Sequence, residues 1–575
     1  MPRDNGVNRR SFLKAAGGAA AAATLAGCAA DPDETSPSDG GTGGDGGSTS
    51  TGGDGGDGGS GGGNVLTYAR GNDSGTLDPQ NTTSGEDVKV TNQLYDQLIM
   101  FKPGETALQA GLATDWSLEG TTTTLTLREG VTFHNGEEFT AEDVVATYNR
   151  FVNPDYEHYP GDQYVSVYGP FTLGNWIDTI ETDGKYNVTM QMTQKYAPFL
   201  RNLAMFAASI LSKKAIQEKG QKLKSEPVGT GPFQFEGWDT GSQQIRLSKN
   251  PDYWGETASV DEVVFTAIGS NTTRAQTLDS GGADIIDGLG AQASKIVTQS
   301  SNAELVDQAG INVGYMAFNM AKVEAFRDKR VRQAISHAVD TQAIVETIFK
   351  GIAEQASQPI PSNVMGYNDD LSPYEKNLDK AQSLLDEAGY GDGFSFELAT
   401  FKNPRTYNPS PIQAAQTVKS NLSEIGIEVS INQQSFNPFL DYVDQGKHDA
   451  CFLGWMTDNG DPDNFFYTLL HPGLSPEDVP EGQDWVSFDT EGFNTNDAAA
   501  WANREFMTLT SEAQTTYDEA TRKQKYKQAS KIAHDEAPWV FIDHAKELRG
   551  VANGISGFTL APISGPFLNL VSKGQ

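Results

Sequence analysis

Cysteine and histidine are scarce in this chain. Its 575 residues include two cysteines and seven histidines, and no Cys/His cluster has the spacing of a zinc site. Cys451 lies in the apolar segment 450–453, which is typical of a buried strand, where cysteine is usually a small hydrophobic residue. Cys28 belongs to an export signal. We therefore expect no intramolecular disulfide, no metal site and no cofactor.

Long apolar runs and basic residues are also lacking. No apolar stretch reaches the about 20 residues that a transmembrane helix needs. Lysine and arginine number 42 against 76 aspartates and glutamates, which gives a net charge of -34. This charge excludes nucleic acid as a partner, because phosphate binding needs a basic surface. An ordinary acidic secreted protein is one interpretation. We favour a halophilic protein, because molar salt screens the self-repulsion of such a surface.

The motifs of common enzymes are absent. There is no Gly-x-Ser-x-Gly elbow, no His-Glu-x-x-His and no phosphate loop. The acidic run 458–463 fails as a calcium loop, because Asp463 stands where glycine is needed and Leu469 where glutamate is needed. This run is expected to be a polar turn. We expect no enzyme, although a secreted peptidase or esterase with a dispersed triad stays an alternative.

The N-terminus carries the pattern of an export signal. Residues 8–14, Asn-Arg-Arg-Ser-Phe-Leu-Lys, match a twin-arginine motif, and an Ala/Gly-rich stretch too short for a membrane anchor follows. Leu-Ala-Gly-Cys at 25–28 is similar to a lipobox, so we expect residues 1–28 to be a lipoprotein signal with Cys28 lipidated. Residues 29–63 are predicted to be a flexible linker with an end-to-end distance of about 30 Å. The protein would then be exported folded and anchored on the outer face of the cytoplasmic membrane.

From residue 64 onward, strand and helix patterns alternate, which favours α/β layers. Thr140 and Asp143 form the pattern of a capping box at the start of a helix. A single long helix is predicted over 329–350, capped by Asp328 and ended by Gly351. Further helices are predicted over 378–387, which closes on Gly389, and 412–425, and strands over 64–69, 125–128 and 427–431.

Three blocks resemble landmarks of extracellular solute-binding proteins of family 5, the peptide and nickel group. They are 127–136 with 139–144, 227–233 with 250–255, and 330–335 with 338–340. The resemblance covers residues 64–575 and implies a two-lobed, type II periplasmic-binding-protein-like fold with an extra domain and the ligand in the cleft between the lobes. It implies a receptor that serves an ABC permease. A monomer is the default expectation. The implied division is 64–98, 228–312 and 544–575 for lobe I, 99–227 for the extra domain and 313–543 for lobe II.

Further blocks are similar to dipeptide-binding members of this family. In those members, an aspartate after a Gly-Trp strand receives the ligand's α-ammonium, and an arginine before Tyr-Asn-Pro receives its α-carboxylate. The matching positions are Asp458 and Arg405, although Thr406 replaces a proline of the pattern. Such a pair would select a zwitterionic ligand by the distance between its ammonium and carboxylate groups. In molar salt the Debye length is about 3 Å, so both groups must be enclosed when the lobes close.

Two further sets of residues are candidates for the same site. The aromatic residues Trp455, Tyr407 and Phe436 are candidate walls, with ordinary core packing as the equal alternative. Backbone groups at Thr83, Ser84 and Gly85 are candidate hydrogen-bond partners of the ligand. The family varies in its solutes, so longer oligopeptides, a nickel complex or an oligosaccharide remain alternatives to a dipeptide.

Overall fold

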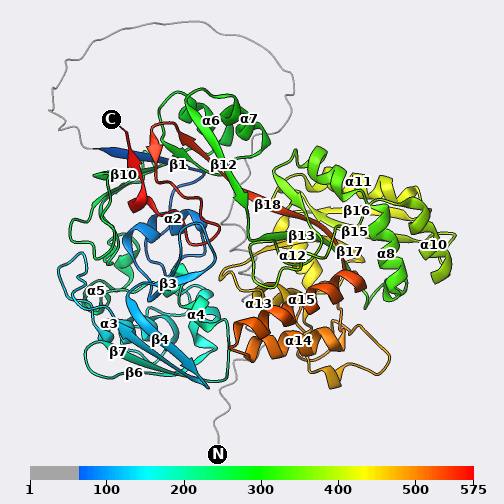
Figure 1. The fold of residues 1–575 in the computed structure, drawn as a ribbon, viewed down its shortest axis with the longest axis horizontal. Coiled ribbons are helices and arrows are strands. Elements are labelled where there is room, and N and C mark those ends of the chain that lie inside the picture. Colours follow the sequence, from blue (N-terminus) through cyan, green and yellow to red (C-terminus); the bar gives the residue numbers. More distant parts are fainter. Residues whose placement is uncertain (1–63, 575) are drawn as a thin grey trace, which may run out of the picture.

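A large twisted sheet of 12 strands joins the two main bodies of the molecule (Figure 1). The computed structural model describes residues 64–574. Along the sheet the strand order is β16-β15-β17-β13-β18-β11-β1-β10-β9-β8, with β12 and β14 paired to β18. Helices and strands alternate along the chain and pack as layers, which is the α/β class predicted from the sequence.

The first body is built on β1. This strand is parallel to β10 and to β11, and β9 and β8 extend the sheet with antiparallel pairing. Apolar residues of β1 such as Leu66 and Tyr68 are fully buried, which is why this short segment holds the centre of the layer. Its elements are β1 (Val65–Arg70), α2 (Gly85–Leu94), β8 (Phe233–Asp239), β9 (Gln244–Lys249), β10 (Glu262–Ala267), α6 (Asn271–Asp279), β11 (Ile285–Ile286) and α7 (Ala291–Gln299).

The second body surrounds β13, whose seven residues are all buried. β17 pairs with β13, and β15 lies parallel to both β16 and β17. Cys451 of β17 is fully buried and free, as predicted for a small core residue. The elements are β13 (Asn312–Phe318), α8 (Lys329–Ala338), α10 (Leu378–Ala388), β15 (Ser395–Phe401), α11 (Pro411–Ser423), β16 (Glu428–Gln434), α12 (Phe436–Asp444), β17 (Ala450–Met456), α13 (Asp463–Leu470), α14 (Arg504–Thr515) and α15 (Glu519–Glu536).

One long strand connects the two bodies. β18 (Trp539–Ala552) pairs through its first half with β13 and through its second half with β11 and β12 (Ala303–Ala309). β14 (Ala353–Gln355) pairs with the middle of β18. The pairing register shifts between Gly314 and Tyr315, which places a bulge in β18 at this point. The predicted lobe boundaries at 312/313 and 543/544 fall within β13 and β18.

A smaller body is inserted between α2 and β8, at the lower left of Figure 1. Its four-stranded sheet has the order β4-β5-β7-β6. The capping box at α3 is confirmed, since the Thr140 backbone N–H donates to the Asp143 carboxylate at 2.9 Å. The elements are β2 (Ile99–Phe101), β3 (Leu108–Ala110), β4 (Ala113–Glu119), β5 (Thr122–Leu127), α3 (Ala141–Val152), β6 (Ile177–Thr182), β7 (Asn187–Met192), α4 (Phe199–Asn202) and α5 (Lys213–Lys219).

The prediction of one helix over 329–350 is wrong. Asp328 caps α8 as expected, but this helix ends at Ala338, and a short helix and a π-turn follow over 341–348. Asp340 causes the interruption, because its side chain accepts from the Ala343 backbone N–H at 2.9 Å and thereby caps a new helix. The predicted close of α10 on Gly389 is confirmed, with φ at 82°.

Within residues 64–574, no helix combines the length and apolarity that crossing a membrane requires. Cys28, the twin-arginine motif and the Gly-rich linker lie outside the described residues. The predicted division into lobe I, lobe II and extra domain stays a prediction, although β18 joins two bodies and the inserted segment has a sheet of its own.

Candidate ligand-binding site

A cavity of about 180 Å³ lies where the first body, the inserted body and the loop after β17 meet. The predicted residues Thr83, Gly85 and Asp458 line it. The other wall consists of the C-terminal loop 558–566, which contributes mainly apolar groups. Residues that the sequence patterns missed also line this cavity, namely Lys89, Tyr168, Phe206, Ile311, Glu547 and Arg549.

Asp458 occupies the first turn after β17, and neighbouring side chains hold this turn in place. The Asp458 backbone N–H donates to Oδ1 of Asn464 at 3.3 Å, and the Trp455 indole N–H donates to the same oxygen at 2.9 Å. Thr457 Oγ1 accepts from the Gly460 N–H at 3.0 Å. The run 458–463 is therefore a hydrogen-bonded turn, as predicted, and it presents the Asp458 carboxylate to the cavity.

The Asp458 carboxylate has a neutral partner. The Tyr168 hydroxyl donates to its Oδ1 at 2.8 Å, and no described Lys or Arg forms an ion pair with it. Burial raises the pKa of Asp458 to about 6, because a low-dielectric surrounding disfavours the charged form and only the tyrosine hydrogen bond opposes this effect. The site therefore holds an acid whose charge lacks a cation.

Arg405 carries a positive charge that has no anionic partner among the described residues. Its guanidinium carbon lies 3.7 Å from the centroid of the Phe436 ring, and Nη1 donates to the Pro404 carbonyl at 2.9 Å. Its Nε has no hydrogen-bond partner among the described residues, and no described carboxylate lies within ion-pair distance. Burial lowers the pKa of Arg405. Phe436 therefore acts as a wall for this cation, which retains capacity to bind an anion.

Tyr407 connects the segment of Arg405 to that of Asp458. Its ring covers Gly454 of β17 so closely that a Cβ atom at Gly454 would lie 2.2 Å from the ring. Gly454 immediately precedes Trp455, whose indole shares Asn464 with the backbone of Asp458. The fold therefore places both charges on adjoining segments. Arg405, Tyr407, Phe436 and Trp455 do not line the cavity of Asp458.

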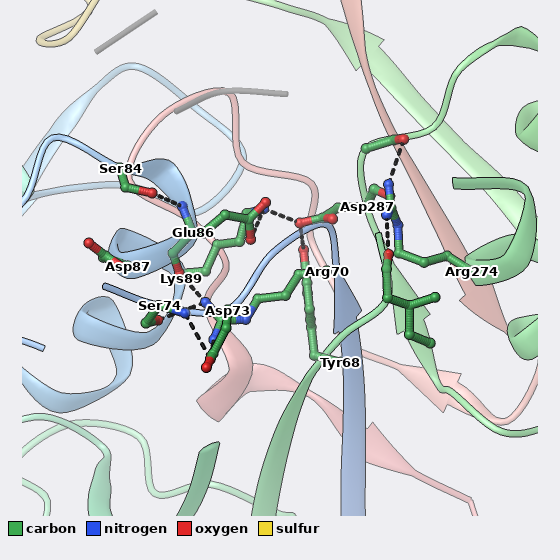
Figure 2. Close-up of polar contacts among 12 residues, drawn as sticks. Tyr68, Arg70, Asp73, Ser74, Ser84, Glu86, Asp87, Lys89, Arg274 and Asp287 are labelled. Atoms are coloured by element: carbon green, nitrogen blue, oxygen red, sulfur yellow. Dashed lines mark hydrogen bonds and ion pairs between the residues drawn. The ribbon is translucent and has the colours of Figure 1, made fainter. Parts of the chain in front are cut away.

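The three candidate residues at the N-terminus of α2 have different roles. The Ser84 hydroxyl accepts from the Glu86 backbone N–H at 3.3 Å, so its side chain caps the helix, whereas Thr83 and Gly85 face the cavity. Lys89, one turn further on, forms ion pairs with Glu86 at 3.0 Å and with Asp287 (Figure 2). The positive charge of Lys89 is thus compensated within its own body.

A second contact holds the loop of Asp458 against the inserted body. Asn459 donates to the side chain of Asn202 at 2.9 Å. Asp461 accepts from Arg522 at 2.8 Å and lies 3.6 Å from Arg201 of α4. Figure 1 shows α13, α14 and α15 next to α4. These contacts fix the loop that follows Asp458 against the inserted body.

Tyr168 had no signal in the sequence. It lies 290 residues from Asp458 along the chain and belongs to a different body. Its phenol is buried, with a pKa raised far above its usual range, and therefore stays a hydrogen-bond donor. Only the packing of the inserted body against the loop after β17 reveals this partner.

The comparisons with known proteins identify the family. Residues 107–476 match the family described as bacterial extracellular solute-binding proteins, family 5 Middle, and residues 6–26 match the twin-arginine translocation pathway signal sequence. The dipeptide-binding protein of Escherichia coli is 31% identical over 515 residues, which cover 87% of this chain and 92% of that protein.

Solved structures show the same fold over the described part. HbpA2 from Haemophilus parasuis has a TM-score of 0.81 at 28% identity, covering 89% of this chain and all of that one. The dipeptide-binding protein of Pseudoalteromonas in complex with Met-Leu has a TM-score of 0.69 at 29% identity, covering 88% and 100%. Proteins of this family are non-enzymatic receptors that deliver ligands to ABC permeases, and the twin-arginine signal indicates export from the cytoplasm. The chain belongs to family 5 of the bacterial extracellular solute-binding proteins.

Proposed function

We propose that this receptor captures short peptides of dipeptide size, with Asp458 binding the α-ammonium and Arg405 the α-carboxylate. The observation that carries the proposal is the state of these two groups. Each is partly buried, and neither has an oppositely charged partner among the described residues. Relatives named as dipeptide-binding proteins, one of them solved with Met-Leu, support the same ligand class.

A zwitterionic ligand would supply the missing partner for the unpaired charges of both Asp458 and Arg405. Even partial burial of a charge without a partner is unfavourable, because the charge loses hydration. An ammonium beside Asp458 would stabilise the ionised carboxylate, and a carboxylate beside Arg405 could accept two parallel hydrogen bonds from the guanidinium. Because Phe436 holds the guanidinium plane at 3.7 Å, part of the ordering cost is met before the ligand arrives.

Anchoring of the receptor to the membrane through a lipid on Cys28 is part of the same proposal, as is adaptation to high salt. Lipidation of Cys28 would hold the receptor on the outer face of the membrane, and the linker 29–63 would let it reach a permease. One acyl chain gives only weak membrane binding, so a lipoprotein with more than one chain is expected. Metabolic labelling with a fatty-acid probe tests this, because Cys28→Ala should abolish the label.

The ligand test uses purified protein at high salt. Dipeptides and tripeptides should raise the unfolding temperature, and native mass spectrometry should show a co-purified peptide. Asp458→Asn and Arg405→Gln should each remove the response. Asp444→Asn is the matched control, because the pKa of Asp444 is also about 6 but this residue does not line the cavity.

Three outcomes would contradict the proposal. No response to any peptide would remove it. Co-purification of a nickel complex or an oligosaccharide would replace the ligand class within the same family. An unchanged response in both Asp458→Asn and Arg405→Gln would retain the peptide but move its binding site.

A further inference from the structure

Asp543 is buried without a partner. Its side chain is 0% exposed, and neither carboxylate oxygen has a hydrogen-bond partner among the described residues. An ionised carboxylate in this position would lose its hydration and gain nothing in return, at a cost of several kcal/mol. Such a group needs an explanation in the native structure.

The bulge in β18 directs this side chain. Asp543 pairs with Gly314 of β13 on one side and with Gln355 of β14 on the other. Bulges redirect side chains and are frequent near functional sites. Because Gly314 has no side chain, the Asp543 carboxyl lies directly over it, and a Cβ atom there would be 2.1 Å from Oδ1.

A second oxygen reaches the same point. The same Cβ atom on Gly314 would lie 2.5 Å from the carbonyl oxygen of Tyr407. In the described part of the chain, no N–H or O–H donates to that carbonyl oxygen. Two acceptor oxygens therefore converge over Gly314 with no donor between them. A proton on the Asp543 carboxyl would supply a donor for the Tyr407 carbonyl oxygen.

No charged neighbour changes this conclusion. The titratable residues on the surrounding segments are Tyr315 of β13, Glu354 of β14, Arg405 and Tyr407 of the loop, and His544 of β18. Burial is the one cause of the raised pKa of Asp543, without a contribution from any of these groups. Gln355 is not the donor, because neither Asp543 oxygen has a hydrogen-bond partner among the described residues, and the Gln355 amide donates to Thr341 Oγ1 at 2.6 Å.

We propose that Asp543 is a neutral carboxylic acid whose O–H donates a hydrogen bond to the Tyr407 carbonyl, fixing the loop that carries Arg405. Asp543 is then a positioning residue between β18, which joins the two bodies, and the segment 405–408. The effect of Asp543 on ligand binding rests on the proposed function of Arg405. The protonation of Asp543 and its hydrogen bond to Tyr407 do not depend on that function.

The first test needs no ligand. Asp543→Asn replaces the O–H by an amide N–H, and Asp543→Ala removes the donor. At neutral pH the infrared absorption of protonated carboxylic acids should be stronger in wild type than in Asp543→Asn, in which the other buried acids are unchanged. The folded pKa is raised, so the contribution of Asp543 to stability should fall as pH rises from about 4, the pKa of an unfolded aspartate. The difference in unfolding temperature between Asp543→Asn and wild type should therefore shift in favour of the variant as pH rises. Equal spectra or parallel stability curves would overturn the proposal.

The second test measures peptide affinity. Asp543→Asn should bind neutral dipeptides within about twofold of wild type, and Asp543→Ala about tenfold more weakly, the equivalent of one hydrogen bond. Selective loss of Lys- or Arg-containing peptides in Asp543→Asn would overturn the proposal, because Asp543 would then be an ionised ligand contact. If no peptide binds any form, the proposed function fails and the infrared and pH results still decide on Asp543.

Discussion

Peptide binding should weaken in acid, and Asp458 sets the pH at which it does. The pKa of its carboxyl is about 6 in the free protein, because burial outweighs the hydrogen bond from Tyr168. The ligand ammonium binds the ionised form, so protonation competes with binding below pH 6. For a group with this pKa, about one molecule in eleven is ionised at pH 5, so the apparent Kd should rise about tenfold between pH 7 and pH 5, or ~1.4 kcal/mol.

The ligand contributes little to this change. A peptide carboxyl titrates at about 3.5 and its ammonium at about 7.8, so both stay mostly charged between pH 5 and pH 7. The folded protein binds the Asp458 proton more tightly than the unfolded chain does. The contribution of this group to stability should therefore fall as pH rises from about 4 to about 6, opposite in sign to its effect on ligand affinity.

Isothermal titration calorimetry with a neutral dipeptide at constant high salt is the assay. Asp444→Asn should retain the pH dependence, because Asp444 has a similar pKa outside the cavity. Asp458→Asn should bind weakly at both pH values and lose the dependence. Equal wild-type affinity at pH 5 and pH 7 would refute the reasoning, as would a pH slope that persists in Asp458→Asn.

Three further predictions concern the surroundings of the site. Asp461→Ala should lower the free energy of unfolding by about 3–5 kcal/mol in urea, because it leaves Arg522 and Arg201 buried without their carboxylate; a loss below 1 kcal/mol would contradict this pairing. Gly454→Ala should destabilise by about 1–3 kcal/mol and weaken peptide binding, since a Cβ atom collides with Tyr407; wild-type affinity in this variant would contradict the placement of the ring. With a net charge of -34, the unfolding temperature should rise from about 0.1 M to about 2 M salt, and a flat profile would contradict halophilic adaptation.

Local signals in the sequence were sufficient where a single segment decides its own structure. The Thr140/Asp143 capping box, the Asp328 cap and the close of α10 on Gly389 are all present in the structure. Local reasoning failed at 329–350, because the apolar periodicity continues through Asp340 while its side chain caps a new helix. A periodic apolar pattern records which face is buried, and it does not record a competing hydrogen bond.

The sequence by itself determined the family and the export signal, because these depend on residue types at short spacings, which the chain carries before it folds. The resemblance to that family then gave Asp458 and Arg405 as the charged candidates. Only the tertiary structure decided that Asp458 has a phenol as its partner, and that Asp543 lies unpaired over Gly314. Both facts depend on strand register, a bulge and the packing of segments hundreds of residues apart, and burial then sets which charges are costly.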